Sequence, residues 1–455
     1  MTGDGNDGYN DAVAETRKGA FAALAYRDYL LLWLGQATHA LALWMENIAR
    51  PLLVLEMSDN DAAQLGAVIA VRTVPTLILG LWAGVVTDWF DRQKVLLAAK
   101  IASFLTSAAF ALLLVSGHME LWHIYVLVFL RGSVQAFDQP ARTSLIPSIV
   151  PASMITSAMA LLSSTQSLMR IFGAAGAGVS VALIGLEGTF ILIATLYVGG
   201  VIATLLMRVT AHERPTERGA HAMLDGMMEG LRYARGRPEV RGVLLVALVH
   251  FTFGMVYMQV FAPLFAVDVL DIGSGGLGLL LSFTGIGALA AALVIAQNPP
   301  SRIGLVIPLG VSCMGLVLVA FSAVTYLGGT EGLILALGLM IVVGVFQTTF
   351  MSLSRALLVQ AAPDELRGRV LSLISLDRAA MAGGAALGGF VAAGIGVQPA
   401  QMVFGAICVV GGLLVLWLTP DLRRFRIEDT YQAVSARASA EQPVTAEREA
   451  AVDAR

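Results

Sequence analysis

Residues 84–96 read Gly84-Val-Val-Thr-Asp88-Trp-Phe-Asp91-Arg92-Gln-Lys94-Val-Leu, a charged stretch between two apolar segments. The segment before it covers residues 62–87, and the one after it covers residues 94–116. Each segment is long enough to cross a hydrocarbon layer about 30 Å thick as a helix. Charged side chains are costly within that layer, so the pattern predicts two membrane helices joined by a short turn in water.

The same alternation continues along most of the chain. Of 455 residues, 57% are hydrophobic and 13% are charged, whereas about a quarter are charged in a soluble domain. This composition excludes an ordinary soluble enzyme and predicts an all-α membrane protein. We expect twelve transmembrane helices, at 29–56, 62–87, 94–116, 121–145, 153–184, 188–209, 241–267, 275–297, 303–328, 332–360, 368–395 and 400–419.

Lysine and arginine near the ends of these segments predict the orientation of the chain. Cytoplasmic loops retain an excess of both residues, and here they gather in the second, fourth, sixth, eighth and tenth connections. Both termini are therefore expected in the cytoplasm. Residues 1–19 lack the basic and apolar regions of a cleaved signal peptide.

A long polar stretch divides the segments into two groups of six, which predicts two pseudo-symmetric helical bundles. A weak internal repeat between residues 133–154 and 345–366 favours this division, with Gln135 and Gln347 in matching places. We expect an N-terminal tail (1–27), a first bundle (28–209), a linker with an interfacial helix (210–240), a second bundle (241–420) and a disordered tail (421–455).

The opening stretch also resembles a known signature. A Gly, an Asp four residues later and an Arg four after that, as in Gly84, Asp88 and Arg92, are similar to the loop between the second and third helices of the major facilitator superfamily. Asp91 stands where Gly is usual, as in the branch that contains the enterobactin exporter and macrolide efflux proteins. The resemblance covers residues 26–420. It implies a functional monomer in the bacterial inner membrane. We expect this monomer to export an amphipathic small molecule, siderophore-like or drug-like, by alternating access driven by proton influx.

The resemblance implies an inner gate that opens when the two bundles rock. Charges of alternating sign at predicted span ends could form salt bridges there, or could only solvate helix ends. The expected gate residues are Gly84, Asp88, Asp91, Arg92, Lys94, Asp138 and Arg142. In the fifth segment, Arg170 to Gly178 resembles the family's motif for proton-linked export, but Ala174 replaces its proline, so this motif alone does not support antiport.

Ionisable residues inside predicted spans are the candidates for proton coupling, because each costs about 2.5–3.5 kcal/mol unless it has a partner or faces water. Glu46 and Arg50 are four residues apart and can form a structural pair, or Glu46 can carry a proton when Arg50 is withdrawn. Asp377 and His39 are further candidates. Arg131 and Arg170 either bind an anionic substrate or pair with Glu46 or Asp377 across helices.

Uncharged polar residues in the same spans are candidates for a substrate cavity. The seventh segment adds a four-residue stripe of Phe253, Tyr257, Phe261 and Phe265, which either stacks on a substrate or packs in the core. The expected cavity residues, besides Arg131 and Arg170, are Gln36, Gln135, Gln166, Tyr257, Gln259 and Gln347.

Several classes of function are disfavoured. The net charge is −3 with scattered basic residues, so no nucleic-acid partner is expected. No phosphate-binding loop, His-Glu-x-x-His pair or Gly-x-Ser-x-Gly turn occurs, so we expect neither an enzyme nor a metal or other cofactor. The expected partners are a small molecule, protons and the lipid bilayer. The alternatives are a proton-independent facilitator or lysophospholipid flippase, and a sensor derived from a transporter.

Overall fold

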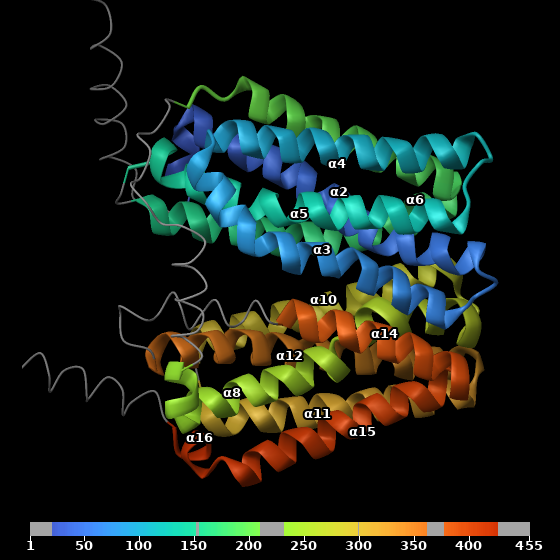
Figure 1. Ribbon diagram of the computed structural model, residues 1–455. Helices are drawn as coiled ribbons and strands as arrows, with labels where there is room; N and C mark the ends of the chain where they lie inside the picture. Colours follow the sequence, from blue (N-terminus) through green and yellow to red (C-terminus); the bar gives the residue numbers. More distant parts are fainter. Residues whose placement is uncertain (1–20, 152–153, 210–231, 299, 362–376, 426–455) are drawn as a thin grey trace, which may run out of the picture.

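A computed structural model describes residues 21–151, 154–209, 232–298, 300–361 and 377–425. Within these ranges the chain forms helices and connecting turns, with no strand. The long helices run side by side along one direction (Figure 1). We call the end where α2 begins and α15 stops the terminal end, and the other the opposite end.

The first half of the molecule contains the helices before residue 207. They are η1 (Ala22–Ala25), α2 (Arg27–Met57), α3 (Ala62–Trp89), α4 (Arg92–Val115), α5 (Leu121–Ile149) and α6 (Ile155–Leu206). Asp61 caps α3, and Asp91 caps α4 by accepting hydrogen bonds from the backbone N–H groups of Gln93 and Lys94 at 2.9 and 3.2 Å. The charged turn of the opening sequence thus starts a helix.

The helix α6 combines the fifth and sixth predicted segments. Gly185 has non-helical torsion angles (φ 69°, ψ −178°) inside it. Thr189 Oγ1 donates to Ser180 Oγ at 3.1 Å, although nine residues of straight helix would separate these residues by about 13 Å. The chain therefore reverses at Gly185, and the two arms of α6 lie side by side.

The second half contains the helices after residue 237. They are α8 (Pro238–Val249), the π-helical η3 (His250–Gly254) and η4 (Tyr257–Phe261), α9 (Ala262–Leu264), the π-helical η5 (Phe265–Val269), α10 (Gly273–Gln297), α11 (Ile303–Val324), the 3-10 helix η6 (Thr325–Leu327), α12 (Gly329–Ala361), α14 (Asp377–Ile395), α15 (Val397–Leu418) and α16 (Pro420–Arg424). Residues 238–269 thus form one continuous helical segment with three π-helical turns. Such turns are rare in proteins, and those that occur often lie at functional sites.

Nine helices in the described ranges are long and apolar enough to cross a membrane. The helices α2 and α5 fall outside this group, and both carry several charged residues. The helix bounds otherwise follow the predicted segments closely. Residues 368–376 of the eleventh segment, the predicted interfacial helix up to residue 231 and most of both tails lie outside the described residues.

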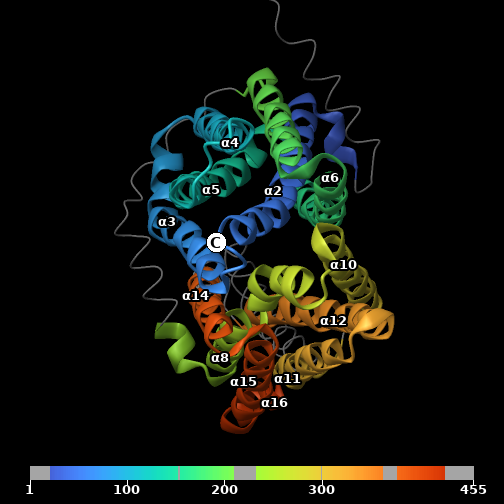
Figure 2. The same ribbon diagram turned by 90° about the vertical axis from the view of Figure 1, so that its right-hand side faces the viewer.

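The two halves face each other through two pairs of helices, α3 with α14 and α6 with α10 (Figure 2). Glycines allow close backbone approach at both contacts. A methyl group on Gly389 would lie 2.3 Å from the carbonyl oxygen of Ala62, and one on Gly178 would lie 3.2 Å from Cα of Gly278. These residues lie in the part of each helix toward the opposite end.

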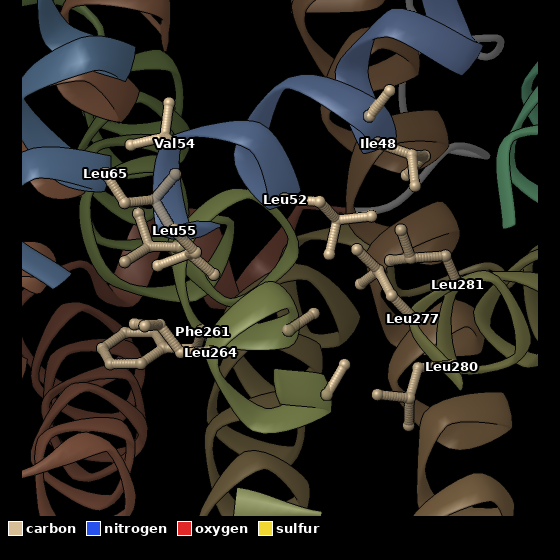
Figure 3. Close-up of a cluster of buried hydrophobic side chains, with 14 of the residues drawn as sticks. Ile48, Leu52, Val54, Leu55, Leu65, Phe261, Leu264, Leu277, Leu280 and Leu281 are labelled. Atoms are coloured by element: carbon tan, nitrogen blue, oxygen red, sulfur yellow. The ribbon is translucent and has the colours of Figure 1, made fainter. Parts of the chain in front are cut away.

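An apolar layer joins the halves in the same region (Figure 3). It includes Leu52 and Leu55 of α2, Phe261 of η4, Leu264 of α9 and Leu277 of α10, all buried. Leu52 and Leu55 line a pocket of about 610 Å³ at the opposite end, whereas the neighbouring Val54 lines a cavity in the middle of the molecule. The layer therefore separates these two spaces.

Candidate substrate cavity and buried charge networks

The middle of the molecule holds a cavity of about 330 Å³ with walls from both halves. Its first-half wall includes Trp44 and Arg50 of α2 and Arg72 of α3, and its second-half wall includes Met258 and Met381. A concave site between two packed units is the usual place for a small-molecule ligand. Three of the glutamines expected in a cavity, Gln135, Gln166 and Gln259, line it.

The first-half wall of this cavity is cationic. Arg72 Nη1 donates to Asn47 Oδ1 at 2.7 Å, which orients the guanidinium without neutralising it. Arg378 of α14 adds another cation and donates to Gln139 Oε1 at 3.0 Å. Among the described residues that line the cavity, Asp377 is the one acid.

The second-half wall includes glutamine and methionine beside Asp377 and Arg378. Gln259 Nε2 lies 3.1 Å from the Sδ atom of Met381. A thioether is a weak acceptor, so a ligand can compete for this amide N–H group. Methionine also adapts its shape readily, and this wall can therefore accommodate different apolar bodies.

Glu46 is the centre of the first of two buried charge networks in the first half. It pairs with Arg50 one turn later, as the spacing predicts, and with Arg131 of α5 at 3.2 Å. Tyr197 of α6 donates to Glu46 Oε2 at 2.7 Å and accepts from Arg131. Arg131 Nη1 donates to Ser103 Oγ at 2.7 Å. Three helices thus meet on one carboxylate that is 1% exposed, and α4 joins the network through Ser103 and Arg131.

Asp138 is the centre of the second network. Lys100 Nζ of α4 lies 2.6 Å from Asp138 Oδ1, Arg142 Nε lies 3.8 Å from Oδ2, and His39 Nε2 lies 3.9 Å from Oδ1. The networks adjoin, because the rings of His39 and Tyr197 contact each other with centroids 5.0 Å apart. The two charge networks therefore lie next to each other inside the first half.

The sequence places Asp138 near a span end, either in a salt bridge or solvating the helix end. Its side chain is buried against α2 and α4, where it is paired. Seven residues, or about two helical turns, separate it from Arg131, so both lie on the same inward face of α5. Arg142, also buried, is paired with it.

The other expected gate residues have different surroundings. Arg92 Nη1 donates to the carbonyl oxygen of Ser144 at 3.0 Å, which ties α4 to α5. Asp91 is a helix cap and Lys94 is exposed. For Gly84 and Asp88 only the helical backbone is described.

Three expected cavity residues lie in the packed interior instead. Gln36 contacts Lys100 at 3.5 Å, Arg131 belongs to the Glu46 network, and Tyr257 bonds Thr284 at 3.3 Å. Phe261 and Phe265 of the aromatic stripe also pack in the core, against Phe404 and Phe321. Gln36 and Tyr257 are inaccessible because neighbouring helices pack against them, and Arg131 takes the second of its two expected alternatives by pairing with Glu46.

A small pocket of about 30 Å³ beside the cavity holds two further expected residues. Arg170 and Gln347 line it, together with Trp44, which the cavity also contacts. The guanidinium of Arg170 lies 5.9 Å from the ring centroid of Trp44. Arg170 thus contacts an aromatic face and has no ion-pair partner among the described residues.

Asp377 differs from Glu46 in its surroundings. It is half-buried, and its Oδ1 atom has no hydrogen-bond partner among the described residues. An unpaired carboxylate oxygen beside a cavity can accept a proton or a cationic group. No group of three His, Cys, Asp or Glu side chains that could hold a metal occurs in the described ranges.

Sequence reasoning missed Lys100, Ser103 and Tyr197, which complete the two networks. The available signal for Lys100 was its place in the apolar segment 94–116, where a cation needs a partner. Ser103 and Tyr197 carry no such signal, since both residue types are common in membrane helices.

Comparison with known proteins decides the family. The family model described as "Transmembrane secretion effector" matches residues 18–449. The chain belongs to this family of major facilitator transporters. It is therefore a multi-pass membrane transporter and not an enzyme.

Several relatives of the chain are named for the molecules that they transport. It is 24% identical to the staphyloferrin A transporter of Staphylococcus aureus (90% of this chain, 99% of the relative). It is 26% identical to the multidrug efflux pump Tap of Mycolicibacterium fortuitum (83% and 91%) and 25% identical to macrolide efflux protein A of Streptococcus pyogenes (84% and 93%).

The fold of the chain matches solved transporters. One is a bacterial homologue of the human lysosomal transporter Spinster, at a TM-score of 0.69 and 12% identity over 88% of this chain and 99% of that one.

Proposed function

We propose that this secretion effector exports an amphipathic small molecule, siderophore-like or drug-like, from the bacterial cytoplasm across the inner membrane by alternating access. The cavity between the halves carries this proposal, because it combines arginines with an apolar, adaptable wall. The named cargo of the relatives supports the same class of substrate.

We further propose twelve spans in two six-helix bundles (28–209 and 241–420), with both termini and the 210–240 linker in the cytoplasm. Counting α2, α5 and both arms of α6 with the remaining apolar helices supports this number. Arginines and lysines gather at the terminal end, which supports its cytoplasmic placement. Rocking of two such bundles, acting as a monomer, would open the cavity at one end while the glycine contacts and the apolar layer close the other.

Export is proposed to be driven by proton influx, with Asp377 as the proton carrier. Asp377 lines the cavity and has an unpaired oxygen, whereas three partners hold Glu46 in a structural cluster. His39 would then serve to connect the two networks and not to release a proton.

The test is proton movement in proteoliposomes challenged separately with a siderophore, a macrolide and a lysolipid. We expect wild-type protein to show a substrate-triggered proton flux, and Asp377→Asn to lose that flux while it still binds substrate. Glu46→Gln should instead lower the thermal unfolding midpoint. Substrate movement without proton flux in the wild type would overturn antiport and favour a facilitator. Movement of the lysolipid alone would favour a flippase.

A further inference from the structure

The second half contains a separate pocket of about 380 Å³ at the terminal end, which we call the vestibule. Its walls come from residues 234–235, α8, η3, α12 and α14, and most of the wall surface is apolar. The wall residues include Val243, Leu244 and Leu248 of α8 and Phe350 and Leu358 of α12. Leu248 is 55% exposed, so part of this wall is accessible from outside.

Three arginines belong to this vestibule. Arg235, Arg241 and Arg355 all line it, and all are exposed. Each arginine lies near the terminal end of its segment. The polar group of a bound amphipathic molecule would lie at that end. An apolar wall with a cationic entrance is complementary to a molecule with an apolar body and an anionic head.

The vestibule also contains a polar group that nothing in the described chain satisfies. Ser354 is 6% exposed, and its Oγ atom has no hydrogen-bond partner among the described residues. A buried hydroxyl without a partner costs free energy. A ligand oxygen in the vestibule would supply the missing partner.

The vestibule adjoins the central cavity. Phe251, Met351 and Asp377 line both spaces and so form a shared wall. Arginines stand on each side of this wall, Arg355 in the vestibule and Arg378 in the cavity. Beyond it lie Arg50 and Arg72, so the cations continue from the entrance into the cavity.

We propose that the vestibule is the entrance for the exported molecule and that this molecule is an amphipathic anion. The arginines at the entrance hold its anionic head, the apolar wall holds its body, and movement of Phe251 and Met351 admits it to the cavity. This inference rests on the proposed export function and adds to it the charge of the substrate and its route.

Binding to purified full-length protein in phosphatidylcholine nanodiscs tests the substrate class. The probes are dansyl-undecanoate, its uncharged primary amide and the corresponding amine, followed by dansyl fluorescence. Arg241→Gln combined with Arg355→Gln should weaken carboxylate binding about tenfold and change amide binding less than twofold. Arg302→Gln, an exposed arginine at the terminal end outside the vestibule, should change neither.

Two further variants test the pocket and the route. Ala247→Phe fills the vestibule and should weaken both the carboxylate and the amide. Met351 lines both spaces, so Met351→Trp should lower export of the carboxylate at least tenfold, by a larger factor than it weakens carboxylate binding. Unchanged unfolding midpoints would show that these variants fold.

The outcomes separate the two proposals. Equal binding of the carboxylate and the amide, tighter binding of the amine, or unchanged carboxylate binding in the double arginine variant would overturn the inference. Export by Met351→Trp at the wild-type rate would overturn the route. Binding as expected without export of any substrate by the wild type would instead overturn the proposed function.

Discussion

Lys100 Nζ lies 2.6 Å from Asp138 Oδ1, and both side chains are buried between α4 and α5. The sequence separation of 38 residues makes this a contact between helices, in contrast to the local pair of Asp138 and Arg142. Removing one partner of a buried pair leaves an uncompensated charge.

Lys100→Met should therefore destabilise the protein by about 3–5 kcal/mol. The thermal unfolding midpoint in detergent at a fixed heating rate measures the change. The double variant Lys100→Met with Asp138→Leu should recover part of the loss. Lys94→Met, on the exposed side of the same helix, is the matched control. A single variant as stable as this control would contradict the buried pair.

Tyr197→Phe removes one hydroxyl that connects Glu46 and Arg131. We expect a loss of about 1–3 kcal/mol, since a buried acceptor and a buried donor each lose a partner. The unfolding midpoint is compared with that of Tyr326→Phe, whose side chain is exposed. Equal midpoints would mean that the hydroxyl does not hold the network together.

Gly389→Ala tests the contact between α3 and α14. The added methyl group would lie 2.3 Å from the Ala62 carbonyl oxygen, and we expect a cost of about 1–3 kcal/mol from overpacking. Transport should fall more than stability, because the halves could no longer approach. Gly394→Ala, in the same helix with no atom near the added methyl, should transport normally. Normal transport by Gly389→Ala would contradict a role for this contact in closing the opposite end.

Arg72→Gln tests the cationic wall of the cavity. Arg72 is held by Asn47 and has no acidic partner among the described residues. We expect the KM for an anionic amphiphile to rise roughly tenfold, with a smaller change in kcat. Arg302→Gln is the control. A rise in KM for a neutral analogue of equal size would indicate a steric role instead.

Much of the fold could be predicted from the apolar segments, since nine helices in the described ranges are long and apolar enough to cross a membrane. The reversal at Gly185 falls between two predicted segments, and the caps of α3 and α4 follow from Asp61 and Asp91. The π-helical turns of residues 250–269 could not be predicted, because no local pattern distinguishes them from an ordinary helix.

The site was predictable mainly where partners are close in sequence, and the pairing of Arg131 with Glu46 was one of two alternatives. Glu46 and Arg50 are one turn apart, so their pairing could be predicted; Tyr197 reaches Glu46 from 151 residues away. The internal repeat was informative in a different way. Three residues after Gln135 stands Asp138, whereas three after Gln347 stands Phe350. Among the described residues the network around Asp138 therefore lies in the first half, although the counterpart helix of the second half keeps the glutamine.

The order in which the partners of Glu46 are synthesised affects the insertion of α2 into the membrane. When α2 leaves the ribosome, Arg50 is the one partner that Glu46 can have. Arg131 follows 85 residues later and Tyr197 follows 151 residues later. Because a lone carboxylate is costly in lipid, the pair with Arg50 is what allows α2 to insert early. Arg131 and Tyr197 can join Glu46 only after α5 and the second arm of α6 have been made.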